Sequence, residues 1–233
     1  MLEIKEPMAL PTQLAHMLAA PAFALADSSE ACPEQVIAHC TAGIIGWFDV
    51  GQADSLVTLQ RWIRTIVEQL TAARTAQPHR KIAPFAVRKC GVAETRQDRA
   101  ALAVCIAWKV PVIVTSTALP EAIATAIHAY GGLIFKQIDG GEPTAPVPDD
   151  SIDGLILRHP LAGVRQLRQH YRGAIVWSGA ISSGEELLAA EAMGADLACV
   201  GRRFDAGGSG GAANELIDEY MTAKLRITQH HRL

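Results

Sequence analysis

The sequence predicts an α/β fold in which eight strand–helix units close into one parallel barrel. Short apolar runs rich in Val, Ile and Ala alternate with amphipathic stretches of helical length, which is the pattern of repeated βα units around a parallel sheet. The 233 residues, 49% of them hydrophobic, can bury a large core but are few for two ordinary domains. We therefore expect a single (βα)8 TIM-barrel domain over residues 1–233, near the lower size limit of that fold.

The first half of the chain contains four of the expected strands. The fourth of them, Val-Pro-Val-Ile-Val-Thr-Ser, is a continuous apolar run, as expected for a strand that is covered on both faces. The four runs cover residues 18–25, 44–48, 82–87 and 110–116.

Helices are expected between these strands. The first, at about 32–42, has Pro33 near its first turn and Gly43 where a C-terminal glycine belongs. Asp54 or Ser55 can cap the second, whose apolar residues fall on one face at helical spacing and predict a core-facing helix. These residues are Leu56, Leu59, Ile63, Ile66, Val67 and Leu70. A third helix is expected at about 96–109.

The second half repeats the pattern with one interruption. The stretch 139–151 carries three prolines and no helical pattern, so we expect a loop in place of the helix after strand five. Ser182 and Ser183 each precede a Glu by three residues, which predicts two overlapping capping boxes before a helix that ends by Gly194. The glycine-rich stretch 205–213 is predicted to be flexible. Strands are expected at 133–138, 154–157, 174–177 and 196–200, and the other helices at 120–130, 161–171 and 214–226.

Composition argues against several classes of partner. A formal charge of −3, a pI near 6.2 and scattered Lys and Arg give no basic surface for nucleic acid. No apolar run approaches the roughly 20 residues that span a bilayer. The stretch 14–26 resembles a signal-peptide core, but acidic residues precede it, so we expect a cytoplasmic protein. Five cysteines without a C-x-x-C pair indicate neither a disulfide framework nor a metal site.

The most informative stretch is 177–204, where two successive predicted strands end in small-residue turns. The first turn is Ser178-Gly179-Ala180-Ile181. Its small residues Gly179 and Ala180 let backbone N–H groups approach a ligand closely. In the second, Gly201 and Arg202 present further donors from the neighbouring strand. Phosphate sites after strands seven and eight recur in this barrel, so the two turns predict an anion cradle, with ordinary tight barrel turns as the alternative.

In these motifs the chain resembles the nitronate monooxygenase (2-nitropropane dioxygenase) family of FMN-binding barrels. The family's Ala-Pro-Met strand corresponds to Ala20-Pro21-Ala22-Phe23, and its Ala-Gly-Gly-Leu-Gly motif to Ala42-Gly43-Ile44-Ile45-Gly46. Its later Gly-Gly-Ile and Gly-Thr-Arg-Phe motifs correspond to Gly179-Ala180-Ile181 and Gly201-Arg202-Arg203-Phe204. The resemblance implies FMN with its phosphate at Ser178, Gly179, Ala180, Gly201 and Arg202, and its ring near Ala22 and Phe23.

The chain departs from this family where the catalytic base belongs. The family carries a histidine in a Gly-Gly-His loop after strand six, and the matching position here is Arg165, which cannot accept a proton. His159 is the candidate acid or base nearby, with a purely structural histidine as the alternative. Arg88, Lys136 and Arg158 are candidates to bind an anionic substrate, although each can equally be a solvated charge at a strand end.

Three functions remain open from the sequence. The first is an FMN-dependent oxidoreductase that acts on a small carbanion-forming substrate such as a nitronate. The second is a catalytically degenerate barrel that binds a phosphorylated ligand or a partner protein, and the third is a flavin-free lyase or isomerase of a sugar phosphate. A barrel without one covering helix exposes apolar strand surface, so a homodimer is also expected.

Overall fold

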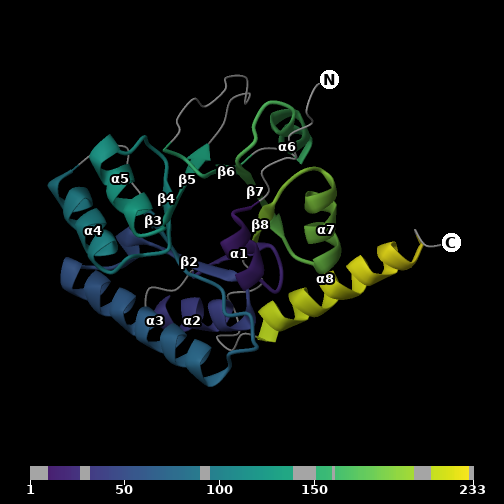
Figure 1. Ribbon diagram of the computed structural model, residues 1–233, viewed down its shortest axis with the longest axis horizontal. Coiled ribbons are helices and arrows are strands. Elements are labelled where there is room, and N and C mark those ends of the chain that lie inside the picture. The colour runs from purple at the N-terminus through teal and green to yellow at the C-terminus, as the bar shows by residue number, and fades with distance from the viewer. Residues whose placement is uncertain are drawn as a thin grey trace.

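The chain forms a closed parallel barrel surrounded by helices (Figure 1). The computed structural model describes residues 10–26, 32–89, 95–138, 151–158, 161–201 and 211–230. Within this part, eight parallel strands pair in the order β1 to β8, and β8 pairs with β1 to close the ring. The strands are β1 Ala22–Leu25, β2 Ile45–Asp49, β3 Ala86–Lys89, β4 Val112–Thr115, β5 Leu133–Ile138, β6 Gly154–Leu157, β7 Ala174–Ile181 and β8 Leu197–Val200. The predicted (βα)8 TIM barrel is confirmed.

Helices connect most of these strands. They are α1 Thr12–Met17, α2 Cys32–Ala42, α3 Leu56–Ala76, α4 Arg96–Ala107, α5 Glu121–Ala129, α6 Leu161–Arg168, α7 Gly184–Ala192 and α8 Gly211–His230, with a short 3-10 turn at Val50–Gln52. The described residues between β5 and β6 contain no helix, as predicted. No helix in the described segments is long and apolar enough to cross a membrane.

Side chains alternate along each strand between the barrel interior and the helical layer. Phe23, Trp47 and Phe135 lie in the interior, where the Phe23 ring meets Trp47 and Phe135 edge to face at centroid distances of 5.9 and 6.0 Å. Leu14 of helix α1 joins this interior cluster, together with Leu10 and Leu18 on either side of the helix. The segment after α1 hydrogen bonds near the starts of β2 and β3, since Ala19 N–H donates to Gly43 and Lys81 to Leu18. Helix α1 therefore closes the amino-terminal end of the barrel.

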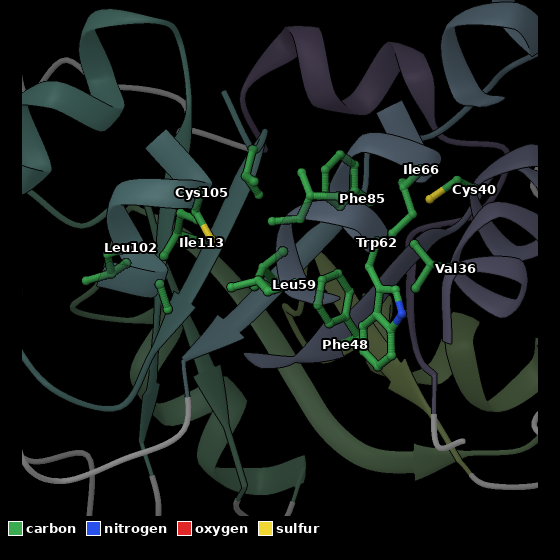
Figure 2. Close-up of a cluster of buried hydrophobic side chains, with 14 of the residues drawn as sticks. Val36, Cys40, Phe48, Leu59, Trp62, Ile66, Phe85, Leu102, Cys105 and Ile113 are labelled. Carbon is green, nitrogen blue, oxygen red and sulfur yellow. The ribbon is translucent and has the colours of Figure 1, made fainter. Parts of the chain in front are cut away.

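The outer layer of the core joins strands to helices α2, α3 and α4. Figure 2 shows Phe48 of β2 beside Trp62 of α3, and their rings meet edge to face at 5.8 Å. The predicted core face of α3 is confirmed, because Leu59, Trp62, Ile63, Ile66 and Leu70 are buried while Leu56 and Val67 are half-buried. Burial of such side chains contributes roughly 1.5–3 kcal/mol each relative to exposure.

The predicted helix ends are largely confirmed. Gly43 and Gly194 adopt φ angles of +103° and +99°, which side-chain-bearing residues rarely adopt, so each terminates its helix. Ser55 caps α3 by accepting a hydrogen bond from Thr58 N–H. Of the two overlapping capping boxes, only Ser183 caps α7; the Glu186 carboxylate instead accepts from Ser182.

Several predicted boundaries are wrong. Residues 18–21 are not a strand; they connect α1 to β1, and only Ala22–Leu25 pairs in the sheet. Strand β3 is Ala86–Lys89 rather than 82–87, since pairing with β2 and β4 begins at Ala86. The expected turn at residues 178–181 belongs to β7, which continues to pair with β8 at Ile181. Helix α8 starts at Gly211, so residues 211–213 of the stretch predicted to be flexible are helical, whereas 205–210 lie outside the described residues.

Close packing of α2 on β2 depends on Gly46. A Cβ at this position would lie 2.7 Å from the Val36 carbonyl oxygen and 3.1 Å from the His39 Cβ. We expect Gly46→Ala to lower the free energy of unfolding by about 1–3 kcal/mol, because the helix backbone must move to admit a methyl group. Gly51 is the matched control, because a Cβ added there would meet no atom within 4 Å. When both variants are measured by urea titration, Gly51→Ala should therefore change the free energy of unfolding little.

His39 makes folding sensitive to acid. Its side chain is only 5% exposed on α2, and this burial lowers its pKa from 6.5 to about 4. Between pH 6.5 and 4, His39 binds a proton in the unfolded chain but stays neutral in the folded chain. The free energy of unfolding therefore falls as the pH drops from 6.5 to 4. The shift corresponds to about 3 kcal/mol at the acid end of that window.

We expect His39→Gln to remove this part of the pH dependence, measured by urea unfolding at several pH values. His79→Gln, at an exposed position, is the control that should retain the wild-type pH profile. A His39→Gln profile parallel to the wild type would assign the acid sensitivity to other groups.

Candidate functional site

The carboxyl ends of the strands form the barrel mouth, since α1 closes the opposite end. In parallel barrels, ligand sites lie at this mouth. Because side chains alternate along a strand, the last inward-facing position of several strands lies at this mouth, and it is polar in five cases. These residues are Asp49 of β2, Arg88 of β3, Gln137 of β5, Arg158 after β6 and Ser178 of β7. Five strands thus direct hydrogen-bonding or charged side chains toward one opening, directly above the aromatic interior.

Arg88 is held in place by neighbours on two other strands. Its guanidinium forms a two-point ion pair with the Asp49 carboxylate, and its Nη1 lies 3.5 Å from Gln137 Oε1. The guanidinium carbon also lies 4.8 Å from the Trp47 ring centroid, a cation–π arrangement. The β2–β3 register, which pairs Asp49 with Arg88, produces this ion pair. Sequence reasoning found Arg88 but missed Asp49, Trp47 and Gln137.

Arg88 and Arg158 act on the same point of the barrel interior. Burial raises the pKa of the Cys199 thiol to about 11, while a hydrogen bond with Ser178 and the positive charges of Arg88 and Arg158 lower it. The thiol therefore stays protonated near neutral pH and is no nucleophile. Both arginines are nevertheless near enough to Cys199 for their positive charges to act on its thiol.

Ala22 and Phe23, predicted to lie near a flavin ring, are both fully buried. Ala22 packs in the helix-facing cluster with Ala20 and Ala24, whereas Phe23 faces the interior and is enclosed by Trp47 and Phe135. Neither side chain is exposed at the mouth.

The predicted phosphate cradle differs from an open pair of turns. The Gly201 N–H donates to the Ile181 carbonyl at 2.7 Å, so this donor serves β7–β8 pairing. A Cβ added at Gly179 would overlap the indole ring of Trp177, so this ring lies directly against Gly179. Ala180 lies in β7, and Arg202 lies outside the described residues. The described part of the predicted cradle therefore lacks a free Gly201 N–H, one of the donors that the prediction counted on.

Of two further candidates, Lys136 faces away from the interior and His159, the candidate acid or base, lies outside the described residues. Lys136 alternates with Phe135 and Gln137, and so shares the face of Ile134, which packs in the helix-facing core. Among the predicted substrate residues, Arg88 and Arg158 therefore have inward parity at the mouth, and Lys136 does not.

Comparison with known proteins supports the fold. No family model and no curated protein sequence matches the chain. Among solved structures, it resembles a FabK mutant from Thermotoga maritima, with a TM-score of 0.67 and 19% identity over 85% of this chain and 66% of that one. It also resembles the nitroalkane oxidase of Streptomyces ansochromogenes, with the same TM-score and identity over 85% of this chain and 70% of that one.

A third similar structure differs in length. A native KDPGal structure superposes with a TM-score of 0.58 and 14% identity, covering 90% of this chain and 96% of that one. The chain thus spans slightly less than two thirds of the FabK structure but nearly all of the KDPGal structure. At these identities the likeness shows the barrel fold alone.

The Asp49–Arg88 pair offers a test of the mouth's structure. Both side chains are mostly buried, with 16% and 23% exposed, so Asp49→Asn leaves a poorly hydrated guanidinium without its counter-charge. We expect a loss of roughly 2 kcal/mol in the free energy of unfolding, less than for a fully buried pair. The control is Glu191→Gln, which removes the exposed Glu191–Lys224 pair and should cost less than about 1 kcal/mol. Equal losses in both variants would contradict the special burial of the mouth pair.

Proposed function

We propose that this barrel binds a small phosphorylated molecule at its mouth, without a bound flavin. The observation that carries the proposal is the inward parity of Arg88, Arg158 and Ser178 at the carboxyl ends of β3, β6 and β7, with both arginine charges and the Ser178 hydroxyl acting on the Cys199 thiol. Guanidinium groups recognise phosphate through charge-assisted hydrogen bonds, and a hydroxyl completes such a site.

Two guanidinium groups at the mouth can bind an anion. Asp49 forms an ion pair with Arg88 and orients it, and Arg158 follows β6 at the same end of the barrel. The solved structures with this fold include a KDPGal structure of nearly the same length as this chain. This proposal leaves open whether the bound molecule is only held or is also converted, as in a sugar-phosphate lyase or isomerase.

A second candidate is an FMN-dependent oxidoreductase of nitronate monooxygenase type. It is favoured by the fold likeness to a nitroalkane oxidase and by the motifs shared with that family. It is opposed by the pairing of Gly201 N–H with Ile181, by the Trp177 ring against Gly179, and by Arg165 in place of a base. Binding of an FMN phosphate by the Gly201 N–H would require its hydrogen bond with the Ile181 carbonyl to break.

Purified protein separates the two candidates directly. We expect no flavin band in its visible absorbance spectrum and none after incubation with FMN, but saturable heat on titration with inorganic phosphate at fixed ionic strength. Arg158→Gln should weaken phosphate binding by roughly 2 kcal/mol, the worth of a hydrogen bond to a charged group.

Arg172→Gln, which removes an exposed arginine outside the mouth, is the matched control and should bind phosphate like the wild type. A yellow protein, or one that takes up FMN, would instead support the oxidoreductase. Phosphate binding that is equally weak in both arginine variants would contradict a site at Arg158.

A further inference from the structure

The indole N–H of Trp47 is a buried hydrogen-bond donor without an acceptor. The side chain is 4% exposed, and its Nε1 has no hydrogen-bond partner among the residues that the structure describes. Tryptophan N–H groups that are buried usually find a partner, because an unpaired donor inside a protein costs free energy. An unpaired donor at this depth therefore points to an acceptor that enters from outside the chain.

The position of Trp47 identifies where that acceptor comes from. Trp47 lies on the interior face of β2, two residues before Asp49, and the guanidinium of Arg88 covers its ring. The Phe23 ring meets the indole edge to face, with ring centroids 5.9 Å apart. The indole thus lies at the boundary between the apolar interior and the polar mouth, with the Arg88 guanidinium over its ring.

The hydrogen-bonding groups around it are mostly donors. Arg88, Arg158 and the Trp47 N–H only donate, and the Cys199 thiol, kept protonated by burial, donates as well. Among the described residues, the acceptors at the mouth include the Asp49 carboxylate and Gln137 Oε1, which already accept from Arg88, and the Ser178 hydroxyl, which is hydrogen bonded with Cys199. A ligand that satisfies this arrangement must be rich in acceptor oxygens.

We infer that Trp47 is a ligand-binding residue, whose Nε1–H donates to an oxygen of the phosphate group held between Arg88 and Arg158. This inference rests on the proposed function and adds to it the depth and orientation of the ligand: the phosphate points into the barrel, and the rest of the molecule faces solvent. The sequence offered no signal for this role, because a tryptophan within an apolar strand is expected to be core.

The test uses the indole N–H resonances of full-length, ¹⁵N-labelled protein, titrated with inorganic phosphate against sodium chloride of equal ionic strength. The chain has four tryptophans, and Trp47→Phe identifies the Trp47 signal. If that variant does not fold, Trp62→Phe, Trp108→Phe and Trp177→Phe identify it by elimination. We expect the Trp47 signal to shift with saturation. Trp47→Phe should weaken phosphate binding about tenfold, as for loss of one hydrogen bond to a charged acceptor, while Trp62→Phe binds normally.

The failures of the two proposals are distinguishable. Phosphate binding that depends on Arg158 but leaves the Trp47 resonance unmoved would overturn this inference alone, and would assign the Nε1 donor to water. A wild-type protein that does not bind phosphate would overturn the proposed function and this inference with it.

Discussion

Closure of eight parallel strands into a narrow ring is the constraint on which the rest of this structure depends. A closed sheet leaves each strand only two directions for its side chains, inward to a small cylinder or outward to the helices. Phe23, Trp47 and Phe135 fill the cylinder, and α1 covers its amino-terminal end. Inward-facing polar side chains are therefore concentrated at the carboxyl ends of the strands, where they can contact both solvent and one another.

The Asp49–Arg88 pair marks the transition from this apolar interior to the mouth. A charged arginine beside buried aromatic rings is unfavourable unless its charge is compensated, and the two-point pair with Asp49 provides that compensation. Once fixed there, the guanidinium covers Trp47 and contributes, with Arg158, a positive environment around Cys199. The residues that stabilise the mouth are thus those to which the proposed function assigns ligand binding.

The resemblance to flavin-dependent barrels and the geometry of this mouth lead to different expectations. The motifs that resemble that family lie at the starts of β1 and β2 and at the ends of β7 and β8, and similar solved structures include a nitroalkane oxidase. Yet the Gly201 amide is engaged in strand pairing, and Trp177 lies against Gly179. One fold supports many chemistries because small changes at the strand ends alter the site without altering the barrel. The β7–β8 region of this chain is a change of that kind.

The sequence by itself determined the fold class, the order of the elements and most helix ends. Strands and helices show apolar periods of about two and 3.6 residues, and their ends are marked by residues such as Gly43, Gly194 and Ser55. These are local properties, so the spacing of residues along the sequence reveals them. Of the candidate site it identified Arg88, Arg158 and Ser178, because polar residues at strand ends stand out against apolar runs.

Tertiary structure alone decided what these residues contact. Four steps along β7 from Trp177 to Ile181 face only two along β8 from Ala198 to Val200, an irregularity that turned an expected loop into strand. Register placed Ala22 and Lys136 outside the barrel and set Asp49 beside Arg88, which is 39 residues away in sequence. Which face of a strand turns inward, and which distant partner it meets, is fixed only when the ring closes, because each strand's register depends on both neighbours.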